Sequence, residues 1–335
     1  MTNVTVFDTK KYDRDHLGKA LLDAGLNVKF REFRLNADTV ETVGDDTDVV
    51  CVFVNDKVDR KVVQVLAEKG VKMIALRCAG FNGVDLQAAK EHGILVARVP
   101  AYSPYAVAEH AVTLAMALNR RIPQANRRVR DMNFTLDGLV GFDMHGKTVG
   151  LIGTGKIGKI AGEIFKGFGT RVIMWDPYPD QKWADEHGLE YVSLSQIGQD
   201  ADIVSVHVPL FPETHHIING LVISELKKGV IIINVSRGAL IDTVALIEGL
   251  KSGHVGGVGL DVYEEEEGKF FEDLSGQVMT DDVLARLMTF PNVIITAHQA
   301  FLTQEALNEI ARVTTENIQA FAAGEQPDAS RIVSA

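Results

Sequence analysis

The stretch from Val149 to Asp176 constrains the fold of this chain more than any other part of the sequence. It begins with an apolar run of the length of a buried strand and breaks into the glycine-rich turn Gly153-Thr154-Gly155-Lys156-Ile157-Gly158. Apolar residues then recur at helical spacing as far as Gly167, and a second apolar run ends at Asp176. A G-x-G-x-x-G pattern between a strand and a helix, with an acidic residue about twenty positions further on, is typical of a dinucleotide-binding βαβ unit.

Each residue type in this stretch has a physical purpose at such a site. Gly153 permits the tight turn, Gly155 lets backbone N–H groups approach a pyrophosphate, and Gly158 lets the helix pack closely on the strand. The helix N-terminus favours the negative charge of the phosphates. Asp176 would accept hydrogen bonds from the adenosine ribose and repel a 2′-phosphate, so the sequence predicts NAD rather than NADP. The alternative is a plain βαβ turn that binds no ligand.

Length, charge and hydropathy exclude several other classes of protein. The 335 residues are enough for two domains, and the net charge of −11 argues against general binding to nucleic acids or to acidic membranes. No apolar stretch reaches the ~18 residues of a membrane-spanning helix. The first residues lack the layout of a signal peptide. The two cysteines, Cys51 and Cys78, lie in or beside apolar runs, and we expect buried thiols in a cytoplasmic protein.

The chain as far as residue 100 alternates short apolar runs with segments of helical spacing. Strands are predicted at Val4–Phe7, Val28–Phe30, Val49–Val54, Met73–Leu76 and Leu95–Val99. Helices are predicted at Asp13–Ala24, Arg60–Lys69 and Leu86–His92. This alternation is typical of a parallel sheet covered on both faces. Gly80 follows one of the strands, where it either presents backbone N–H groups to an anion or serves only the turn.

A long apolar helix is predicted to follow Ser103-Pro104, which have the residue types of an N-cap and a first helical position. The helix is apolar nearly all round from Ala106 to Leu118, which predicts burial between domains or subunits. Glu109 and His110 interrupt it. Because adjacent residues on a helix do not face each other, we interpret them as helix-packing polar residues and not as a catalytic pair.

After the glycine-rich stretch the chain continues as a second α/β series. Buried parallel strands are predicted at Asp202–Pro209, Val230–Val235, Gly257–Val262 and Val293–Thr296. The acidic segment from Glu264 to Met279 is predicted to be an excursion loop. Arg237, Glu266 and His298 follow three of these strands. Because the carboxyl ends of the strands in such a sheet line one crevice, these three side chains could converge.

These three groups would form a complete set for reducing a 2-keto acid. Arg237 can hold a carboxylate in a bidentate pair, and a protonated His298 can donate a proton to the carbonyl oxygen. Glu266 can orient the imidazole and favour its charged form. The alternatives are a structural histidine and a surface glutamate, and His207 has the same ambiguity. His215-His216 lacks ligand-like neighbours, so we predict no metal site.

The chain resembles the D-isomer-specific 2-hydroxyacid dehydrogenases, and within them the fermentative D-lactate dehydrogenase subgroup. The motifs that carry the family resemblance are the glycine-rich turn, Val235–Asp242 (VSRGALID), Gly259–Glu266 (GLDVYEEE) and Ala297–Phe301 (AHQAF). The subgroup is supported by Arg77–Asp85, Val99–Pro104, Ala108–Ala111 and His298–Thr303. The similarity covers nearly the whole chain, with the motifs in the family's order.

The resemblance implies an α/β fold of two Rossmann- or flavodoxin-like doubly wound parallel-sheet domains with the cleft between them. It implies a discontinuous substrate-binding domain, residues 1–101 plus 301–335, and an NAD-binding Rossmann domain, residues 102–300. The helical segment Gln304–Ala323 would then belong with the N-terminal part of the chain.

The resemblance also implies roles for individual residues. Arg237 would bind the substrate carboxylate and polarise the ketone, His298 would be the general acid and base, and Glu266 its partner. Substrate contacts would further involve Ala79, Gly80, Tyr102 and Phe301. NAD contacts would involve Gly153, Thr154, Gly155, Lys156, Ile157, Gly158, Asp176, His207, Pro209, Val235, Ser236 and Asp261.

The resemblance therefore implies a cytoplasmic NAD-dependent oxidoreductase that interconverts pyruvate and D-lactate in fermentation. Its partners would be a small 2-keto or 2-hydroxy acid and further copies of itself, as a dimer or tetramer, with no nucleic acid and no membrane. One alternative is the same chemistry on a bulkier 2-keto acid. The other is a non-enzymatic NAD(H)-sensing co-regulator.

Overall fold

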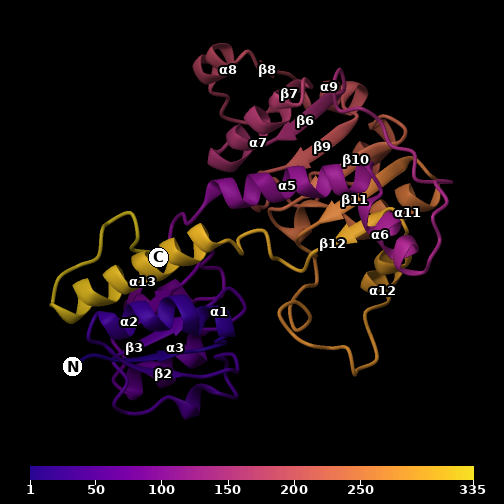
Figure 1. Cartoon of the computed structure of the whole chain (residues 1–335). Helices are drawn as coiled ribbons and strands as arrows, with labels where there is room; N and C mark the ends of the chain where they lie inside the picture. Colours follow the sequence, from indigo (N-terminus) through magenta and orange to yellow (C-terminus); the bar gives the residue numbers. More distant parts are fainter. The chain divides into compact units, whose positions relative to one another are not determined.

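The computed structural model describes all 335 residues, which divide into two compact units. The first unit comprises Met1–Ser103 and Phe301–Ala335, and the second comprises Pro104–Ala300. Each unit is a parallel sheet with helices, so the predicted fold class of two doubly wound α/β domains is confirmed (Figure 1). No helix of the chain has both the length and the apolar character needed to cross a bilayer.

The first unit contains a five-stranded parallel sheet in the order β2-β1-β3-β4-β5, which is the flavodoxin-like order. The register places Val4 opposite both Val28 and Val49. The two central strands β3 and β4 are buried along their whole length, as their continuous apolar sequences require. The strands are β1 (Asn3–Val6), β2 (Asn27–Phe30), β3 (Val49–Val52), β4 (Met73–Leu76) and β5 (Leu95–Ala97).

The helices of the first unit come from both ends of the chain. The C-terminal helix α13 (Gln304–Ala322) packs against α2 (Lys19–Asp23), and Figure 1 shows its yellow ribbon along the indigo N-terminal helices. Its Ala311 and Ile318 belong to the same core as the strands β1, β3 and β4. The remaining helices are α1 (Lys11–Asp13), α3 (Arg60–Glu68) and α4 (Leu86–Glu91), with a 3₁₀ turn at Val40–Thr42.

The predicted helix Asp13–Ala24 is interrupted in the structure. A π-helical turn, Arg14–Gly18, separates α1 from α2. Gly18 lies against the ring of Phe30, and a Cβ at this position would come within 2.9 Å of the ring. The π-helical turn therefore lies close to β2 at Gly18, the one glycine of the predicted helix.

The second unit contains a seven-stranded parallel sheet in the order β12-β11-β10-β9-β6-β7-β8. Strand order reverses between β6 and β9, and the crevice beside such a reversal is where doubly wound sheets bind dinucleotides. The strands are β6 (Thr148–Ile152), β7 (Arg171–Trp175), β8 (Glu190–Tyr191), β9 (Ile203–Val206), β10 (Val230–Asn234), β11 (Val255–Leu260) and β12 (Val293–Ile295).

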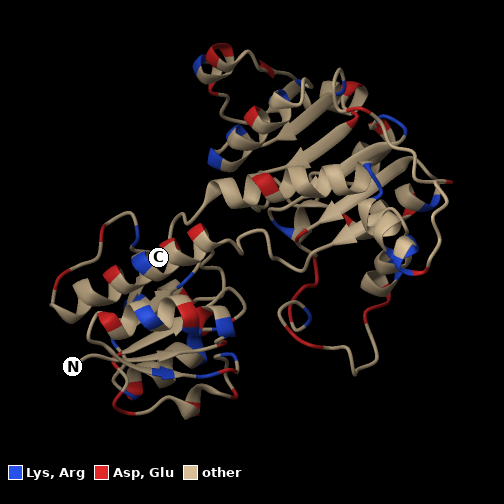
Figure 2. Ribbon diagram, viewed as in Figure 1, with Lys and Arg blue, Asp and Glu red and all other residues tan.

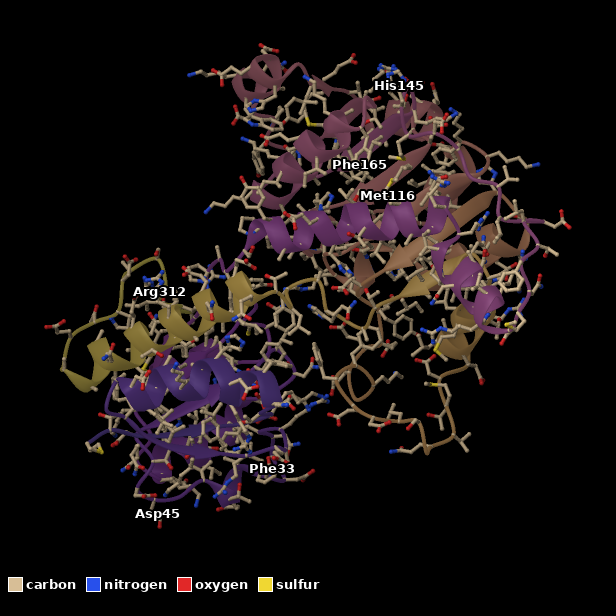
Figure 3. All side chains as sticks on the ribbon, viewed as in Figure 1. Phe33, Asp45, Met116, His145, Phe165 and Arg312 are labelled. Carbon is tan, nitrogen blue, oxygen red and sulfur yellow. The ribbon has the colours of Figure 1, made fainter.

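Helices cover the second sheet in two groups. The first group is α5 (Pro104–Asn119) with α7 (Lys156–Gly167), which pack on each other. Figure 3 labels Phe165 of α7, which is completely buried. The second group, whose apolar residues share a core with β9 and β10, is α9 (Leu194–Asp200), α10 (Gly220–Glu225), α11 (Thr243–Lys251) and α12 (Asp282–Thr289). The remaining helices are α6 (Ile122–Arg130) and α8 (Gln181–His187).

The apolar helix α5 is buried inside its own unit. It packs against α7, β10 and β11, and a Cβ on Gly259 of β11 would come within 3.0 Å of Leu114. A run of exposed apolar side chains follows α5, at Ile122, Val129, Met132, Phe134, Leu136 and Val140. Figure 2 shows that charges lie mainly on helices and loops, while most of the strand surface is uncharged.

Candidate active site

The three motif glycines meet different surroundings after β6. Gly153 has a φ of 102°, and a Cβ there would lie 2.7 Å from the carbonyl carbon of His207 on the loop after β9. A Cβ on Gly158 would lie 2.1 Å from the carbonyl oxygen of Gly153. A Cβ on Gly155 would meet nothing within 4 Å. Other backbone atoms therefore leave no room for a side chain at Gly153 and Gly158, whereas the space beside Gly155 is open. A phosphate that approaches the backbone requires such a space.

The amino end of α7 is suited to binding an anion. Gly155 is its N-cap and offers no side-chain acceptor to the first turn, and the first backbone bond of the helix is from Lys159 N–H to the Gly155 carbonyl. The N–H groups ahead of Lys159 therefore point out of the helix without a helical partner, where the helix dipole also favours negative charge. These features fit the pyrophosphate of a dinucleotide.

Asp176 lies at the end of β7 beside the glycine-rich turn. Its Oδ2 accepts hydrogen bonds from the Thr154 backbone N–H at 2.6 Å and from the Thr154 hydroxyl at 3.0 Å. Its Oδ1 accepts the N–H of Tyr178 at 2.8 Å. The single hydroxyl proton of Thr154 is donated to Asp176. The Tyr191 hydroxyl, 2.7 Å from the Thr154 oxygen, must therefore donate its proton to that oxygen. The carboxylate is thus fixed in orientation while half-exposed, as a ribose partner needs to be.

Glu266 and His298 are in direct contact. The Nδ1 of His298 lies 3.0 Å from a carboxylate oxygen of Glu266, and both side chains are about one-fifth exposed. The two residues follow β11 and β12, which are adjacent and parallel, so they meet at the carboxyl edge of the sheet. Nδ1 is engaged by the carboxylate, which leaves Nε2 as the ring atom available for proton exchange. Glu266, although part of an acidic run, is therefore not a simple surface residue.

His298 is carried by an unusual backbone segment. Ala297 and His298 have φ values of 50° and 60°, and the left-handed conformation costs a non-glycine residue roughly 1–2 kcal/mol. Asp261 at the end of β11 holds this segment: its carbonyl oxygen accepts the N–H of His298 at 2.5 Å. Its carboxylate oxygens accept the N–H groups of Gln299 at 2.8 Å and Ala300 at 3.0 Å.

The Asp261 carboxylate is buried and charged. Burial by itself raises the pKa of this carboxyl, but hydrogen bonds from His110, Thr296 and Ala300 outweigh it, so that the pKa is lowered overall. An ionised carboxylate with this many donors is a fixed anchor for the backbone around it. Asp261, predicted as a contact of NAD, therefore also fixes the position of His298.

Arg237 follows β10, the next strand of the same edge. The turn that carries it is held by Asn234, whose side-chain amide donates to the Arg237 carbonyl at 2.8 Å and accepts the Ser236 N–H at 3.0 Å. The guanidinium donates to the Ser236 carbonyl at 2.7 Å and is otherwise free for a carboxylate. Gly238 packs directly on the backbone of Tyr263. The turn of Arg237 thus lies against the segment that leads to Glu266.

His207 and Val235 lie at the same carboxyl edge, after β9 and β10. The Nε2 of His207 lies 2.9 Å from the Ser205 hydroxyl, and its Nδ1 is buried without a hydrogen-bond partner. Burial lowers the pKa of His207 to about 4, so the ring is neutral near pH 7. The predicted NAD contacts after β6, β7, β9, β10 and β11 therefore share one edge of one sheet.

In the first unit, the predicted substrate contacts lie at the carboxyl edge of the five-stranded sheet. Ala79 and Gly80 follow β4, and neither backbone N–H has an acceptor in the protein. The ring of Phe301 lies 6.2 Å from Tyr102, 5.8 Å from Phe53 and 6.3 Å from Tyr12, measured between centroids. This edge therefore offers free N–H donors and an aromatic cluster.

The expectation that His215 and His216 lack ligand-like neighbours is wrong, because the fold brings Glu264 to them. His216 Nε2 lies 2.6 Å from one oxygen of Glu264, and the other oxygen accepts the Thr243 hydroxyl at 2.9 Å. The two imidazoles stack with their ring centroids 3.9 Å apart, and one nitrogen or oxygen atom from each of the three residues lies within 4.8 Å of the others. The arrangement is a hydrogen-bonded cluster that joins the loop after β9 to the acidic segment.

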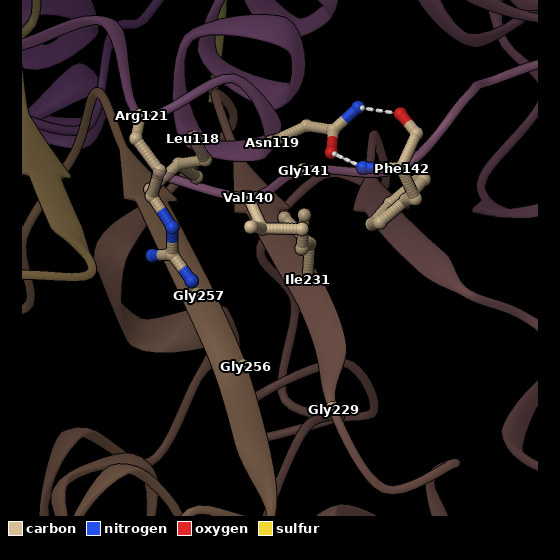
Figure 4. Close-up of a pocket in the computed structure, with 10 residues that line it drawn as sticks. All are labelled: Leu118, Asn119, Arg121, Val140, Gly141, Phe142, Gly229, Ile231, Gly256 and Gly257. Carbon is tan, nitrogen blue, oxygen red and sulfur yellow. Dashed lines mark hydrogen bonds between the residues drawn. The ribbon is translucent and has the colours of Figure 1, made fainter. Parts of the chain in front are cut away.

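A cavity of about 300 Å³ lies at the opposite edge of the second sheet (Figure 4). Gly229 and Gly256, at the amino ends of β10 and β11, line it together with Arg121 and Val140. The figure shows the Asn119 side chain bonded to the backbone of Phe142 at its rim. Since Arg237, Glu266 and His298 follow the carboxyl ends of the strands, this cavity is remote from them.

Comparison with known proteins gives matches over the whole chain. Residues 112–300 match the family model described as D-isomer specific 2-hydroxyacid dehydrogenase, NAD binding domain. The D-lactate dehydrogenase of Escherichia coli K12 is 50% identical over 322 residues, covering 96% of this chain and 97% of that protein.

Two solved structures are similar over the same extent. The apo-structure of D-lactate dehydrogenase from E. coli has a TM-score of 0.89 at 48% identity, covering 97% of this chain and 98% of that one. A structure described as the pyruvate reductase of Chlamydomonas reinhardtii has a TM-score of 0.93 at 44% identity, covering 98% of both chains.

Proposed function

Because this chain belongs to the D-isomer specific 2-hydroxyacid dehydrogenases, we propose that it is an NAD-dependent D-lactate dehydrogenase. The reaction is pyruvate + NADH + H⁺ to D-lactate + NAD⁺, in either direction. The observation that carries the proposal is the 3.0 Å contact of His298 with Glu266, at the same sheet edge as Arg237 and the glycine-rich turn. The D-lactate dehydrogenase of E. coli, which is 50% identical over 322 residues, supports lactate and pyruvate as the substrates.

The chain's own residues fit an NAD molecule. The open space at Gly155 and the uncapped amino end of α7 would take the pyrophosphate, and the half-exposed Asp176 would take the adenosine ribose. A carboxylate at Asp176 disfavours the 2′-phosphate of NADP. When bound, the reduced nicotinamide supplies the hydride.

The remaining steps belong to the protein. Arg237 binds the pyruvate carboxylate through a planar fork of N–H donors and holds the ketone beside His298. His298 donates the proton on Nε2 to the carbonyl oxygen, and Glu266 keeps the ring oriented by accepting the Nδ1 proton. Protonated His298 serves reduction and neutral His298 serves lactate oxidation. Reduction should therefore be favoured at lower pH and oxidation at higher pH.

The first unit would complete substrate binding. We assign residues 1–101 and 301–335 to the substrate-binding domain and residues 102–300 to the NAD-binding domain. The free N–H groups of Ala79 and Gly80 would donate hydrogen bonds to the substrate carboxylate. The rings of Tyr102 and Phe301 would pack around the methyl group of the substrate. The roles of Lys156, Ile157, Pro209, Val235 and Ser236 as NAD contacts belong to the same proposal.

The substrate is tested by NADH consumption with a panel of 2-keto acids, with the chirality of the product determined enzymatically. Pyruvate should have the highest kcat/KM and give D-lactate. Faster turnover of a branched-chain or aromatic 2-keto acid would favour the bulkier-substrate alternative. Since one methylene is worth only ~1–3 kcal/mol, the panel must include close homologues. No turnover of any acid would favour an NAD(H)-sensing co-regulator.

The chain is proposed to act as a cytoplasmic homo-oligomer. The support for self-association is the exposed apolar segment after α5, where Met132 is 76% and Val140 84% exposed. The buried thiols of Cys51 and Cys78, which are not joined in a disulfide, fit a reducing compartment. Sedimentation of the wild type and of Leu136→Asp tests association, and a monomeric wild type would contradict it.

A further inference from the structure

His110 of α5 makes contacts that its place on an apolar helix does not require. Its Nε2 lies 2.9 Å from the Thr296 hydroxyl and 3.5 Å from Oδ1 of Asp261, and the side chain is 16% exposed. The Thr296 hydroxyl in turn lies 2.7 Å from Oδ1 of Asp261. A carboxylate can only accept, so the single hydroxyl proton points to Asp261. The Thr296 oxygen must then accept from His110, whose Nε2 therefore carries a proton.

The hydrogen bonds continue from Asp261 to His298. The Asp261 carboxylate holds the N–H groups of Gln299 and Ala300, and its carbonyl oxygen holds the N–H of His298. These bonds fix a segment whose left-handed residues would relax if released. His110, Thr296 and Asp261 thus form one polar chain that ends on the backbone of His298. The hydrogen bond and ion pair of His110 are with Thr296 and Asp261, and not with the side chains of Arg237, Glu266 or His298.

We propose that His110 is a positioning residue for the proton-transfer step, acting through Thr296 and Asp261 on His298. The inference rests on the proposed function, because His110 is assigned the role of orienting His298, the acid that donates a proton during reduction. The N–H of His110 holds the Thr296 hydroxyl in the orientation in which it donates to the buried Asp261 carboxylate. That carboxylate in turn sets the direction in which the His298 ring leaves the backbone. His110, which takes no part in the chemistry itself, thereby helps to position the His298 ring.

The test compares variants of the full-length protein. His110→Leu removes the N–H donor at similar volume, while His110→Gln keeps an N–H donor at nearly the same place. Glu109→Gln is the matched control, because Glu109 is the exposed neighbour on the same helix. Rates are expressed per NADH-binding site, counted by fluorescence titration, so that misfolded protein does not lower the apparent kcat.

In His110→Leu, kcat should fall ~10- to 100-fold, because a misplacement of about 1 Å has this effect on an aligned reaction. The KM values for NADH and pyruvate should stay within about twofold, because the glycine-rich turn and Arg237 lie on other strands. His110→Gln should recover kcat to within about threefold, and Glu109→Gln should match the wild type. Thr296→Val, which removes the relay hydroxyl, should lower kcat as His110→Leu does, and the double variant should lose little more.

A readout independent of turnover is the imidazole C–H resonance of His298 in isotope-labelled protein, assigned by its loss in His298→Gln. This resonance should shift in His110→Leu and Thr296→Val and return in His110→Gln. An unmoved resonance, or a loss of kcat that His110→Gln does not restore, would overturn the positioning role. An inactive wild type with the expected shifts would instead reject the proposed reaction, so the two failures are distinguishable.

Discussion

Replacing Gly238 with alanine should separate the two strand ends that carry Arg237 and Glu266. The added Cβ would lie 2.0 Å from the carbonyl carbon of Tyr263 and 2.3 Å from the backbone nitrogen of Glu264. These are backbone atoms, so no side chain can rotate away. Ordinary contact begins at 3.4 Å, and the difference from 2.0 Å requires the segments to move apart by about 1.4 Å.

A displacement of this size at Arg237 should lower kcat/KM for pyruvate about a hundredfold, because a misplacement of ~1 Å from the reactive geometry has this effect. NADH affinity should stay near normal, since the glycine-rich turn on β6 is not involved. The assay is the initial rate of NADH consumption over a range of pyruvate concentrations, with NADH binding measured by fluorescence.

The matched control is Gly167→Ala at the end of α7, where an added Cβ would meet nothing within 4 Å. This variant should have wild-type kinetics and be slightly more stable, by ~0.5–1 kcal/mol. If Gly238→Ala kept kcat/KM within about twofold of the control, the close approach of the two segments would not fix the geometry of Arg237, and the reasoning would be refuted.

Three further substitutions test other parts of the account. Arg237→Lys should raise the KM for pyruvate about ten- to a hundredfold, because a point charge replaces a fork and a charged hydrogen bond worth ~1.5–3 kcal/mol is lost; an unchanged KM would remove Arg237 from carboxylate binding. Asp176→Ala should narrow the preference for NADH over NADPH, and unaltered discrimination would show that this carboxylate does not set it. His207→Gln should change the pH dependence of stability. The unfolded histidine takes up a proton near pH 6.5 but the folded one only near pH 4, so unfolding free energy in the wild type should fall by ~3 kcal/mol as pH falls across that window. Urea titrations at both pH values should show a smaller fall in the variant, and an equal fall would place its cause elsewhere.

The sheets could be predicted from the sequence because their strands are continuous apolar runs. The prediction Met73–Leu76 coincides with β4, and Val230–Val235 exceeds β10 by one residue. Strands buried on both faces have this pattern wherever they occur in a doubly wound sheet. The short edge strand β8 was missed, because Glu190 and Tyr191 have no apolar run to mark them.

The partner that buries α5 could not be derived from its sequence. Apolar residues on every face indicate burial but do not indicate against what, and the structure packs them on α7 and the strands of the same unit. The proposed self-association rests instead on the segment after α5, whose apolar residues are exposed.

The site was predictable where side chains follow strand ends, as at Glu266 and His298. The residues that the sequence did not reveal act on the backbone. Asn234 holds the turn of Arg237, and Thr296 with His110 supports the segment of His298. The bonds of Thr296 with Asp261 and of His110 with Thr296 join residues 35 and 186 positions apart, so they leave no periodicity or spacing in the chain. A polar residue inside an apolar helix, as at His110, was the one available signal.

The measurement that tests the account most directly is turnover of pyruvate by His298→Gln beside its affinity for NADH. A general acid contributes about 10²- to 10⁴-fold to a rate, so kcat should fall by roughly a thousandfold. The fluorescence-determined Kd for NADH should remain within about twofold of the wild type, because glutamine leaves the glycine-rich turn and Asp176 unchanged. A variant that kept more than about a tenth of the wild-type kcat would contradict the assignment of His298 as the proton donor.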